Sequence, residues 1–150
     1  MAQSLAKNLI HLIYSTKNRE RYLTSEIRPR LFEYQTGIFG QWDCAPIVIG
    51  GDSDHVHALF VLSKNRLLCR VVEEVKKGSS KWIKLQGDAF SGFYWQSGYG
   101  AFSVSQSHVS KLRLYIEQQE QRHQTVSFQD EFRLFLKRYM IEYDERYVWD

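Results

Sequence analysis

Two histidines separated by one residue stand in the stretch Asp54-His55-Val56-His57. An apolar run over residues 58–62 follows directly, which is typical of a buried strand. Because residues two apart on a strand face the same side, His55 and His57 would project together and could bind one metal ion. So short a motif is more often a pair of ordinary core or surface histidines, and the spacing alone leaves both interpretations open.

A second pair of polar side chains lies further along, on a predicted helix. Tyr115 and Gln119 are four residues apart, so they occupy neighbouring positions on one helical face. The apolar spacing around them predicts that this helix begins at Ser105 or Ser107 and runs to about His123. A half-buried tyrosine and a solvated glutamine without a function are the alternative for this pair.

The length and composition fit one domain. The chain has 150 residues, of which 43% are hydrophobic, so we expect a single domain over residues 1–150. The formal net charge of +3 permits nucleic-acid binding through a local patch without requiring it. Two distant cysteines, Cys44 and Cys69, and no recognisable signal peptide indicate a reduced, cytoplasmic protein. No apolar run reaches the length of a membrane span, so we expect no membrane partner.

The order of the predicted elements defines the fold class. Periodicity predicts a strand over residues 5–14, a helix over 27–42, strands over 45–51 and 55–62, a helix over 67–83 and a final strand over 93–96. This order predicts an α+β fold with a ferredoxin-like (RRM-like) βαββαβ antiparallel sheet. In that fold the first and third strands are central and both crossover helices cover one face. The histidine pair would lie mid-sheet, with the other face left for a ligand.

Additional C-terminal helices follow this unit. One carries Tyr115, and the next opens with a capping box over residues 127–130. Upstream, His11 lies in the first predicted strand, in alternation with Leu9 and Ile13. It is either a buried histidine satisfied by hydrogen bonds or a residue beside the metal site.

Four stretches together are typical of a known family. They are residues 11–17 (HLIYSTK), 54–57 (DHVH), 95–105 (WQSGYGAFSVS) and 115–119 (YIEQQ) with His123 after it. In this order the chain resembles the single-tyrosine HUH transposases, which include small insertion-sequence transposases and relatives associated with repetitive extragenic palindromes (REPs). The resemblance covers nearly the whole chain.

The resemblance implies a role for each matched side chain. It implies that His55 and His57 are metal ligands, that Gln119 is the third protein ligand and that Tyr115 is the nucleophile. Many relatives carry paired histidines after the tyrosine helix, where this chain has Arg122-His-Gln124. We therefore do not expect these residues to be ligands. Paired histidines suit zinc, manganese or nickel, whereas the resemblance implies Mg²⁺ with Mn²⁺ as a substitute.

The implied activity is metal-dependent cleavage and rejoining of single-stranded DNA through a 5′-phosphotyrosine. The implied partners are hairpin-bearing DNA ends and a second copy of the chain, in a homodimer whose active sites are shared between subunits. A nucleoid-associated location in a prokaryotic cytoplasm would follow. The basic residues that we expect to contact phosphates are Lys17, Arg19, Arg21, Lys76 and Lys77.

Three alternatives stay open. A domesticated relative that processes REP hairpins would use the same chemistry. A non-catalytic RRM-like nucleic-acid-binding module would share the fold, although the strands carry no base-stacking aromatic signature. A metal-dependent hydrolase would use the histidines without Tyr115, and would cut DNA without a covalent adduct.

Overall fold

A computed structural model describes residues 2–150 of the chain. The strands and helices follow in the order β1 (Asn8–Ser15), α1 (Ile27–Gln41), β2 (Pro46–Asp52), β3 (His55–Leu62), α2 (Leu68–Lys84), β4 (Gly100–Val104), α3 (Val109–Glu117), α4 (Gln119–Arg122) and α5 (Phe128–Arg138). Short 3-10 turns are η1 (Lys17–Arg19), η2 (Asp88–Phe90) and η3 (Gln106–His108). Among the helices of residues 2–150, none has the length and apolarity needed to cross a bilayer.

The sheet has four antiparallel strands in the order β2-β3-β1-β4. With α1 between β1 and β2, and α2 between β3 and β4, this is the predicted ferredoxin-like α+β arrangement, which is confirmed. β2 and β3, the strands predicted over residues 45–51 and 55–62, form a hairpin in which Asp52 pairs with His55. The histidine strand β3 lies between β2 and β1, so the pair stands on an inner strand.

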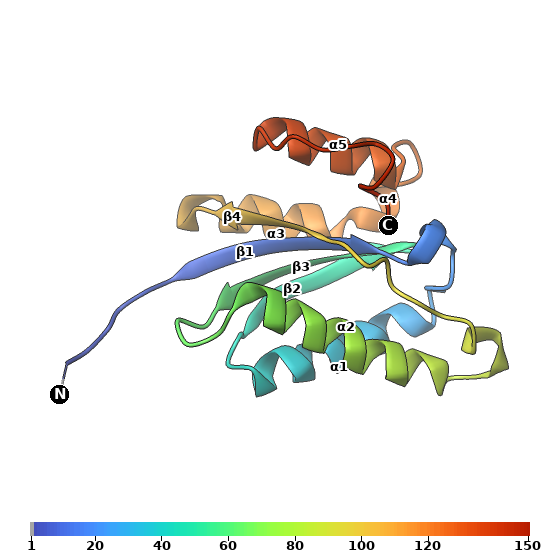
Figure 1. Ribbon diagram of the computed structural model, residues 1–150, viewed down its shortest axis with the longest axis horizontal. Helices are drawn as coiled ribbons and strands as arrows, with labels where there is room; N and C mark the ends of the chain where they lie inside the picture. The colour runs from blue at the N-terminus through green and yellow to red at the C-terminus, as the bar shows by residue number, and fades with distance from the viewer. Residues whose placement is uncertain (1) are drawn as a thin grey trace.

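Helices cover both faces of the sheet (Figure 1). The crossover helices α1 and α2 lie on one face, and α3 and α5 lie over the other. The expectation that this second face is free for a ligand is therefore wrong. The apolar sides of α3 and α5 bury against it and against each other, with Ile13, Phe102 and Phe132 in one of the resulting clusters.

Strict alternation along β3 separates two environments. Val56, Ala58 and Phe60 enter the core that α1 and α2 share with the sheet. His55 and His57 are fully buried on the opposite side, toward α3 and α5. The prediction that the two imidazoles face one way is thus met, and a rigid central strand positions both.

The final strand is not where the periodicity predicts it. Residues 93–96 contribute only an isolated bridge between Trp95 and Thr16, and β4 pairs with β1 further along, ending at Ile13 with Gly100. On the β1 side the two pairings are three residues apart, at Ile13 and Thr16. On the other side they are five residues apart, at Trp95 and Gly100, so the segment between Trp95 and Gly100 bulges away from the sheet. Residues 93–96 alternate because Phe93 and Trp95 pack into the core beneath the sheet.

The predicted helix up to His123 is divided in two. Gln118, with φ −100° and ψ 18°, separates α3 from α4. The 3-10 turn η3 takes up residues 106–108, so α3 begins at Val109 and not at Ser105 or Ser107 as predicted. Gln119 opens α4, and the break keeps its buried side chain directed at the same cluster as Tyr115.

Candidate active site

Both ring nitrogens of His55 face oxygen atoms. Its Nδ1 lies 2.7 Å from Asp54 Oδ1, and its Nε2 lies 2.9 Å from Gln119 Oε1. Burial alone would raise the pKa of Asp54, but its hydrogen bond to His55 keeps this pKa below the ordinary value. Because a carboxylate only accepts, Nδ1 carries the hydrogen, and in the neutral ring the lone pair is on Nε2. This lone pair and the Gln119 amide oxygen are then two electron-pair donors side by side, an arrangement that suits a shared metal ion rather than a hydrogen bond. Metal-binding histidines in proteins are oriented in the same way.

His57 is oriented by His11. The distance between His11 Nε2 and His57 Nδ1 is 2.8 Å, and the two rings stack with centroids 5.0 Å apart. Burial lowers the pKa of both histidines, so both rings are neutral at pH 7. Because the Glu131 carboxylate 2.8 Å from His57 Nε2 only accepts, Nε2 carries the hydrogen and His57 Nδ1 accepts from His11 Nε2; a metal ion bound at Nε2 would replace that hydrogen. His11 therefore fits both interpretations offered for it: it is buried with a hydrogen-bond partner, and it lies directly beside the site.

A buried carboxylate from α5 completes the cluster. Glu131 is 1% exposed, and its Oε1 lies 2.8 Å from His57 Nε2. Its Oε2 accepts hydrogen bonds from the Tyr115 hydroxyl, from Gln119 Nε2 at 3.2 Å and from Arg122 Nε at 3.1 Å. Burial alone would raise the pKa of Glu131, yet His57 and its other cationic or donating neighbours hold the pKa far below its usual range. The carboxylate is therefore ionised.

These groups could hold a divalent metal ion. One ligand atom each from His55, His57, His123 and Glu131 lies within 4.8 Å of all the others. Gln119 Oε1 faces the same point, 2.9 Å from the Nε2 atoms of both His55 and His123. The donors are imidazole nitrogens, one amide oxygen and one carboxylate, which fit a transition-metal ion such as Mn²⁺ more closely than an all-oxygen Mg²⁺ site.

His123 bears on one expectation. The sequence predicts that residues 122–124 lie outside the ligand set, yet His123 lies in the cluster that could hold a metal ion, with its Nε2 3.3 Å from Glu131 Oε1. Its role as a ligand is part of the proposal below. Four residues after Gln119, it follows α4 and points to the same side as Gln119. Its Nδ1 bonds the Val126 carbonyl at 2.6 Å, which fixes the ring. Burial lowers the pKa of His123, but the hydrogen bond to Glu131 raises it overall.

Tyr115 stands at the edge of this cluster. Its ring centroid lies 6.0 Å from that of His57, and the Arg122 guanidinium lies 5.0 Å from its centre. Burial and the negative charge of Glu131 together raise the pKa of the Tyr115 phenol. All four side chains predicted to act, Tyr115, His55, His57 and Gln119, thus come together within a single chain.

None of the basic residues predicted to contact DNA belongs to this cluster, although the charge of Arg21 contributes to lowering the pKa of Asp54. Lys17 and Arg19 belong to η1 and Arg21 follows it, whereas Lys76 and Lys77 belong to α2. Lys76 is engaged within the fold: its Nζ donates to the carbonyl oxygens of Gln96 at 2.8 Å and Gly98 at 2.6 Å. Burial lowers the pKa of Lys76 to about 8. It ties α2 to the segment before β4, and DNA contacts by the five residues stay a prediction.

The sequence reasoning missed Glu131, although the sequence carries a signal for it. The apolar stripe of α5 includes Phe128, Phe132 and Phe135, and Glu131 lies on the same face, three residues after the first and four before the last. An acidic residue within an apolar helical stripe must be paired when buried. The sequence could not show which residue pairs with Glu131, because its partner His57 lies more than seventy residues earlier in the chain.

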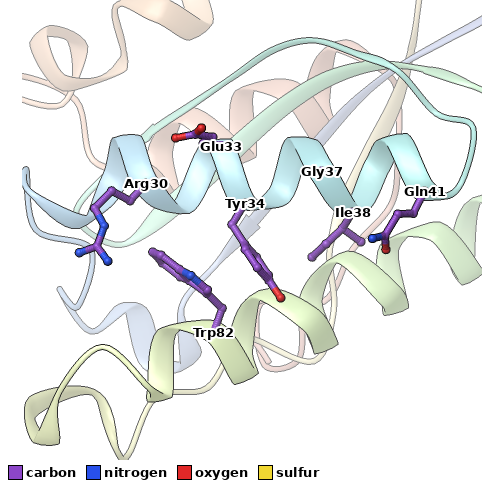
Figure 2. A pocket seen from close by; sticks show the side chains of 7 residues that line it. All are labelled: Arg30, Glu33, Tyr34, Gly37, Ile38, Gln41 and Trp82. Carbon is purple, nitrogen blue, oxygen red and sulfur yellow. The ribbon is translucent and has the colours of Figure 1, made fainter.

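A groove on the opposite layer offers different chemistry. It has a volume of about 470 Å³ and lies between α1 and α2 (Figure 2). Tyr34 and Trp82 stack in it with centroids 5.4 Å apart, and Arg30 lies over Trp82. Among the described residues that line it, Glu33 is the one carboxylate and none is histidine or cysteine. The groove therefore lacks the set of ligands that a metal site needs.

Known proteins share this sequence pattern and fold. The family model described as "Transposase IS200 like" matches residues 4–119. The ISDra2 transposase TnpA of Deinococcus radiodurans is 25% identical over 117 residues, covering 75% of this chain and 84% of that protein. Two solved structures share the fold. A D. radiodurans R1 protein described as a transposase has a TM-score of 0.63 at 23% identity, covering 80% of this chain and 96% of that chain.

The second solved structure is a REP-associated tyrosine transposase bound to a REP hairpin. Its TM-score is 0.57 at 13% identity, covering 77% of this chain and 68% of that chain. Residues 120–150, which include Arg122, His123 and Glu131, lie beyond the segment that the family model matches. The matched segment is more than half of the chain, and the chain belongs to the IS200-like transposase family.

Proposed function

We propose that this transposase cuts and rejoins single-stranded DNA through a covalent bond between Tyr115 and a 5′-phosphate. The observation that carries the proposal is the convergence of the Tyr115 hydroxyl with His55 and His57 on one buried cluster. Glu131 links the two parts, with one oxygen toward the histidines and the other toward the phenol. A half-buried tyrosine without a function has no need of such a partner.

The Tyr115 oxygen is the proposed nucleophile. It attacks the phosphorus of a DNA phosphodiester, the bond from phosphorus to the 3′-oxygen breaks, and a tyrosyl phosphoester forms on the 5′ side. Glu131 Oε2 accepts the hydroxyl hydrogen bond and orients the phenol, whose proton is released to solvent as the new ester forms. The leaving 3′-oxygen takes a proton from solvent and ends as a hydroxyl. A later 3′-hydroxyl reverses the exchange. Each step replaces one phosphoester by another, so no ATP is required. A phenol with an ordinary pKa of about 10 is a good leaving group for rejoining.

The residues that would hold the metal are His55, His57 and Gln119, joined by Glu131 and His123. A divalent ion bound there supplies polarisation of the phosphate oxygens and stabilises the charge on the leaving 3′-oxygen. Mg²⁺ is the ion that the family resemblance implies, and Mn²⁺ suits the nitrogen-rich donor set. Asp54 and His11 orient the two strand histidines from behind.

DNA ends that carry a hairpin are the proposed substrate. The REP-associated relative bound to a hairpin has the same fold, which supports this class of partner. A mobile-element transposase and a domesticated REP-processing nuclease would use the same site, so both remain versions of this proposal. Exposed aromatic side chains beside basic ones, such as Tyr94 with the half-buried Lys84 at 4.1 Å from its ring centre, suit stacking and backbone contacts on single-stranded DNA.

We further propose that one chain assembles its own site. Tyr115, Glu131 and the histidines contact one another without a second copy, and α5 contributes to the same cluster as β3. This supports one domain over residues 1–150. A site within one chain departs from the sharing of active sites between subunits that the resemblance implies. A homodimer as such stays a prediction, as does a cytoplasmic, nucleoid-associated location.

The direct test uses labelled single-stranded DNA from the genomic flanks of the gene. Purified protein with Mg²⁺ or Mn²⁺ is expected to give a protein–DNA adduct on a denaturing gel, and chelation or Tyr115→Phe to abolish it. Tyr34→Phe, in the groove between α1 and α2, is the matched control and should leave the adduct unchanged. Cleavage without any adduct would favour a hydrolase, and hairpin binding without cleavage would favour a binding module.

A further inference from the structure

A cavity of about 310 Å³ opens beside Tyr115. Its lining comes from the end of α3, from α4 and from the turn after it, and consists of Tyr115, Gln118, Gln121, Arg122, Thr125 and Val126. Most of these side chains offer amide, hydroxyl or guanidinium groups. The nucleophile proposed above therefore forms one wall of a polar, solvent-open space.

Arg122 is the cation of this cavity, and it is anchored at one end. Its Nε lies 3.1 Å from Glu131 Oε2, and its guanidinium carbon lies 5.0 Å from the centre of the Tyr115 ring. Its side chain keeps 32% of its surface exposed. Across residues 2–150, neither terminal nitrogen of Arg122 donates a hydrogen bond, and Nε alone is bonded, to Glu131. The geometry fixes the plane of the guanidinium and leaves its outer edge available.

The anchor also sets the position of Arg122 relative to the nucleophile. Glu131 Oε2 accepts from the Tyr115 hydroxyl and from Arg122 Nε at the same time. Any phosphate that the hydroxyl can attack must come close to this shared oxygen, and so within reach of the guanidinium. A planar guanidinium with two free amines matches two phosphate oxygens, and charge-assisted pairs of this kind are strong.

We propose that this cavity receives the DNA backbone at the scissile phosphate and that Arg122 binds that phosphate through its terminal amines. The inference rests on the proposed function and specifies how the substrate enters the site. The ligand class is a phosphodiester of single-stranded DNA. Glu131, on this account, orients the nucleophile and the phosphate-binding arginine with one oxygen.

The alternative is that Arg122 only balances the charge of Glu131. The two roles differ in what they predict for DNA that has lost one charge. A methylphosphonate linkage removes the negative charge of a single phosphate without changing the sequence. Binding is measured in the Tyr115→Phe background without metal, so that no cleavage intervenes, with a series of oligonucleotides that carry one methylphosphonate at each successive position.

With Arg122 present, a methylphosphonate at the scissile position is expected to weaken binding about tenfold or more. In Arg122→Gln the same modification should cost nothing further, and the salt dependence of binding should decrease by about one phosphate contact. Arg122→Lys keeps the charge beside Glu131 and should restore part of the affinity. Arg113→Gln, in an exposed ion pair with Glu117 on α3, is the matched control and should preserve the full effect of the modification.

Two results would overturn the inference. One is an equal loss of affinity from Arg122→Gln at every modified position, because that points to a structural role through Glu131. The other is that Arg122→Gln cancels the effect of a methylphosphonate only at phosphates remote from the cleavage position. If unmodified DNA gives no adduct with the wild-type chain, the proposed function fails instead. If the wild-type chain forms adducts but Arg122→Gln does not change the effect of the scissile methylphosphonate, the proposed function stands and only the role of Arg122 is rejected.

Discussion

The hydroxyl of Tyr115 donates a hydrogen bond to the carboxylate of Glu131, sixteen positions further along the chain. The other oxygen of that carboxylate lies 2.8 Å from His57 Nε2. One buried side chain on α5 thus spans the distance between the phenol and the histidine cluster. In the proposed reaction this contact orients the nucleophile.

Replacing Glu131 by glutamine is expected to lower the pKa of Tyr115. Burial is the larger cause of the raised pKa and the Glu131 charge adds to it, because a negative neighbour disfavours the phenolate. A neutral amide removes the second cause, so phenolate should form at a lower pH than in the wild type. Ultraviolet difference titration of the metal-free protein measures this, with Tyr115→Phe to identify the signal. Glu117→Gln is the exposed control, and an unchanged Tyr115 titration in Glu131→Gln would reject the contact.

Metal affinity should depend on the histidines in graded steps. His57→Ala removes a ligand and is expected to abolish Mn²⁺ binding measured by calorimetry. His11→Phe keeps the ring volume but removes the partner of His57 Nδ1, and loss of such an orienting partner typically costs about 10–100-fold in metal affinity. His108→Ala, at an exposed residue, should bind as the wild type does. Undiminished Mn²⁺ binding by His57→Ala would remove that residue from the ligand set.

The packing of α3 on β2 predicts an effect at Gly50. A Cβ atom added there would lie 2.4 Å from the backbone oxygen of Ile116, next to Tyr115, so the helix must move. Gly50→Ala is expected to lower the free energy of unfolding by about 1–3 kcal/mol and to reduce adduct formation.

Gly37 provides the contrast for that substitution. It lies within α1, where an added Cβ meets nothing within 4 Å, so Gly37→Ala should stabilise the protein by about 0.5–1 kcal/mol. Urea denaturation measures both variants. Equal stabilities for Gly50→Ala and Gly37→Ala would mean that α3 does not approach β2 this closely.

Sequence periodicity predicted those parts of the site that depend on local geometry. A strand repeats every two residues and a helix nearly every four, which was enough to place His55 with His57 and Tyr115 with Gln119. Glu131 and His123 could not be placed in this way, because their positions depend on how α4 and α5 return to the sheet. The prediction of a strand over residues 93–96 was wrong because Phe93 and Trp95 alternate as in a strand, yet tertiary packing rather than strand pairing buries them.

Assembly of the site within one chain predicts a negative result in a mixing experiment. Tyr115→Phe lacks the nucleophile and His57→Ala lacks a metal ligand. Because the two groups meet within the same chain, a mixture of the two variants is expected to form no adduct. Each variant mixed with wild-type protein serves as the control. Recovery of adducts in the double-variant mixture would mean that subunits share their active sites.

The most direct test of the account is to locate the covalent bond. The adduct formed with Mn²⁺ on single-stranded DNA would be trimmed with nuclease, digested with protease and sequenced by tandem mass spectrometry. The account predicts a nucleotide joined through its 5′-phosphate to the peptide that contains Tyr115, and only when divalent metal is present. A nucleotide attached to another residue, such as Tyr143 or Tyr147 of the C-terminal segment, would contradict it.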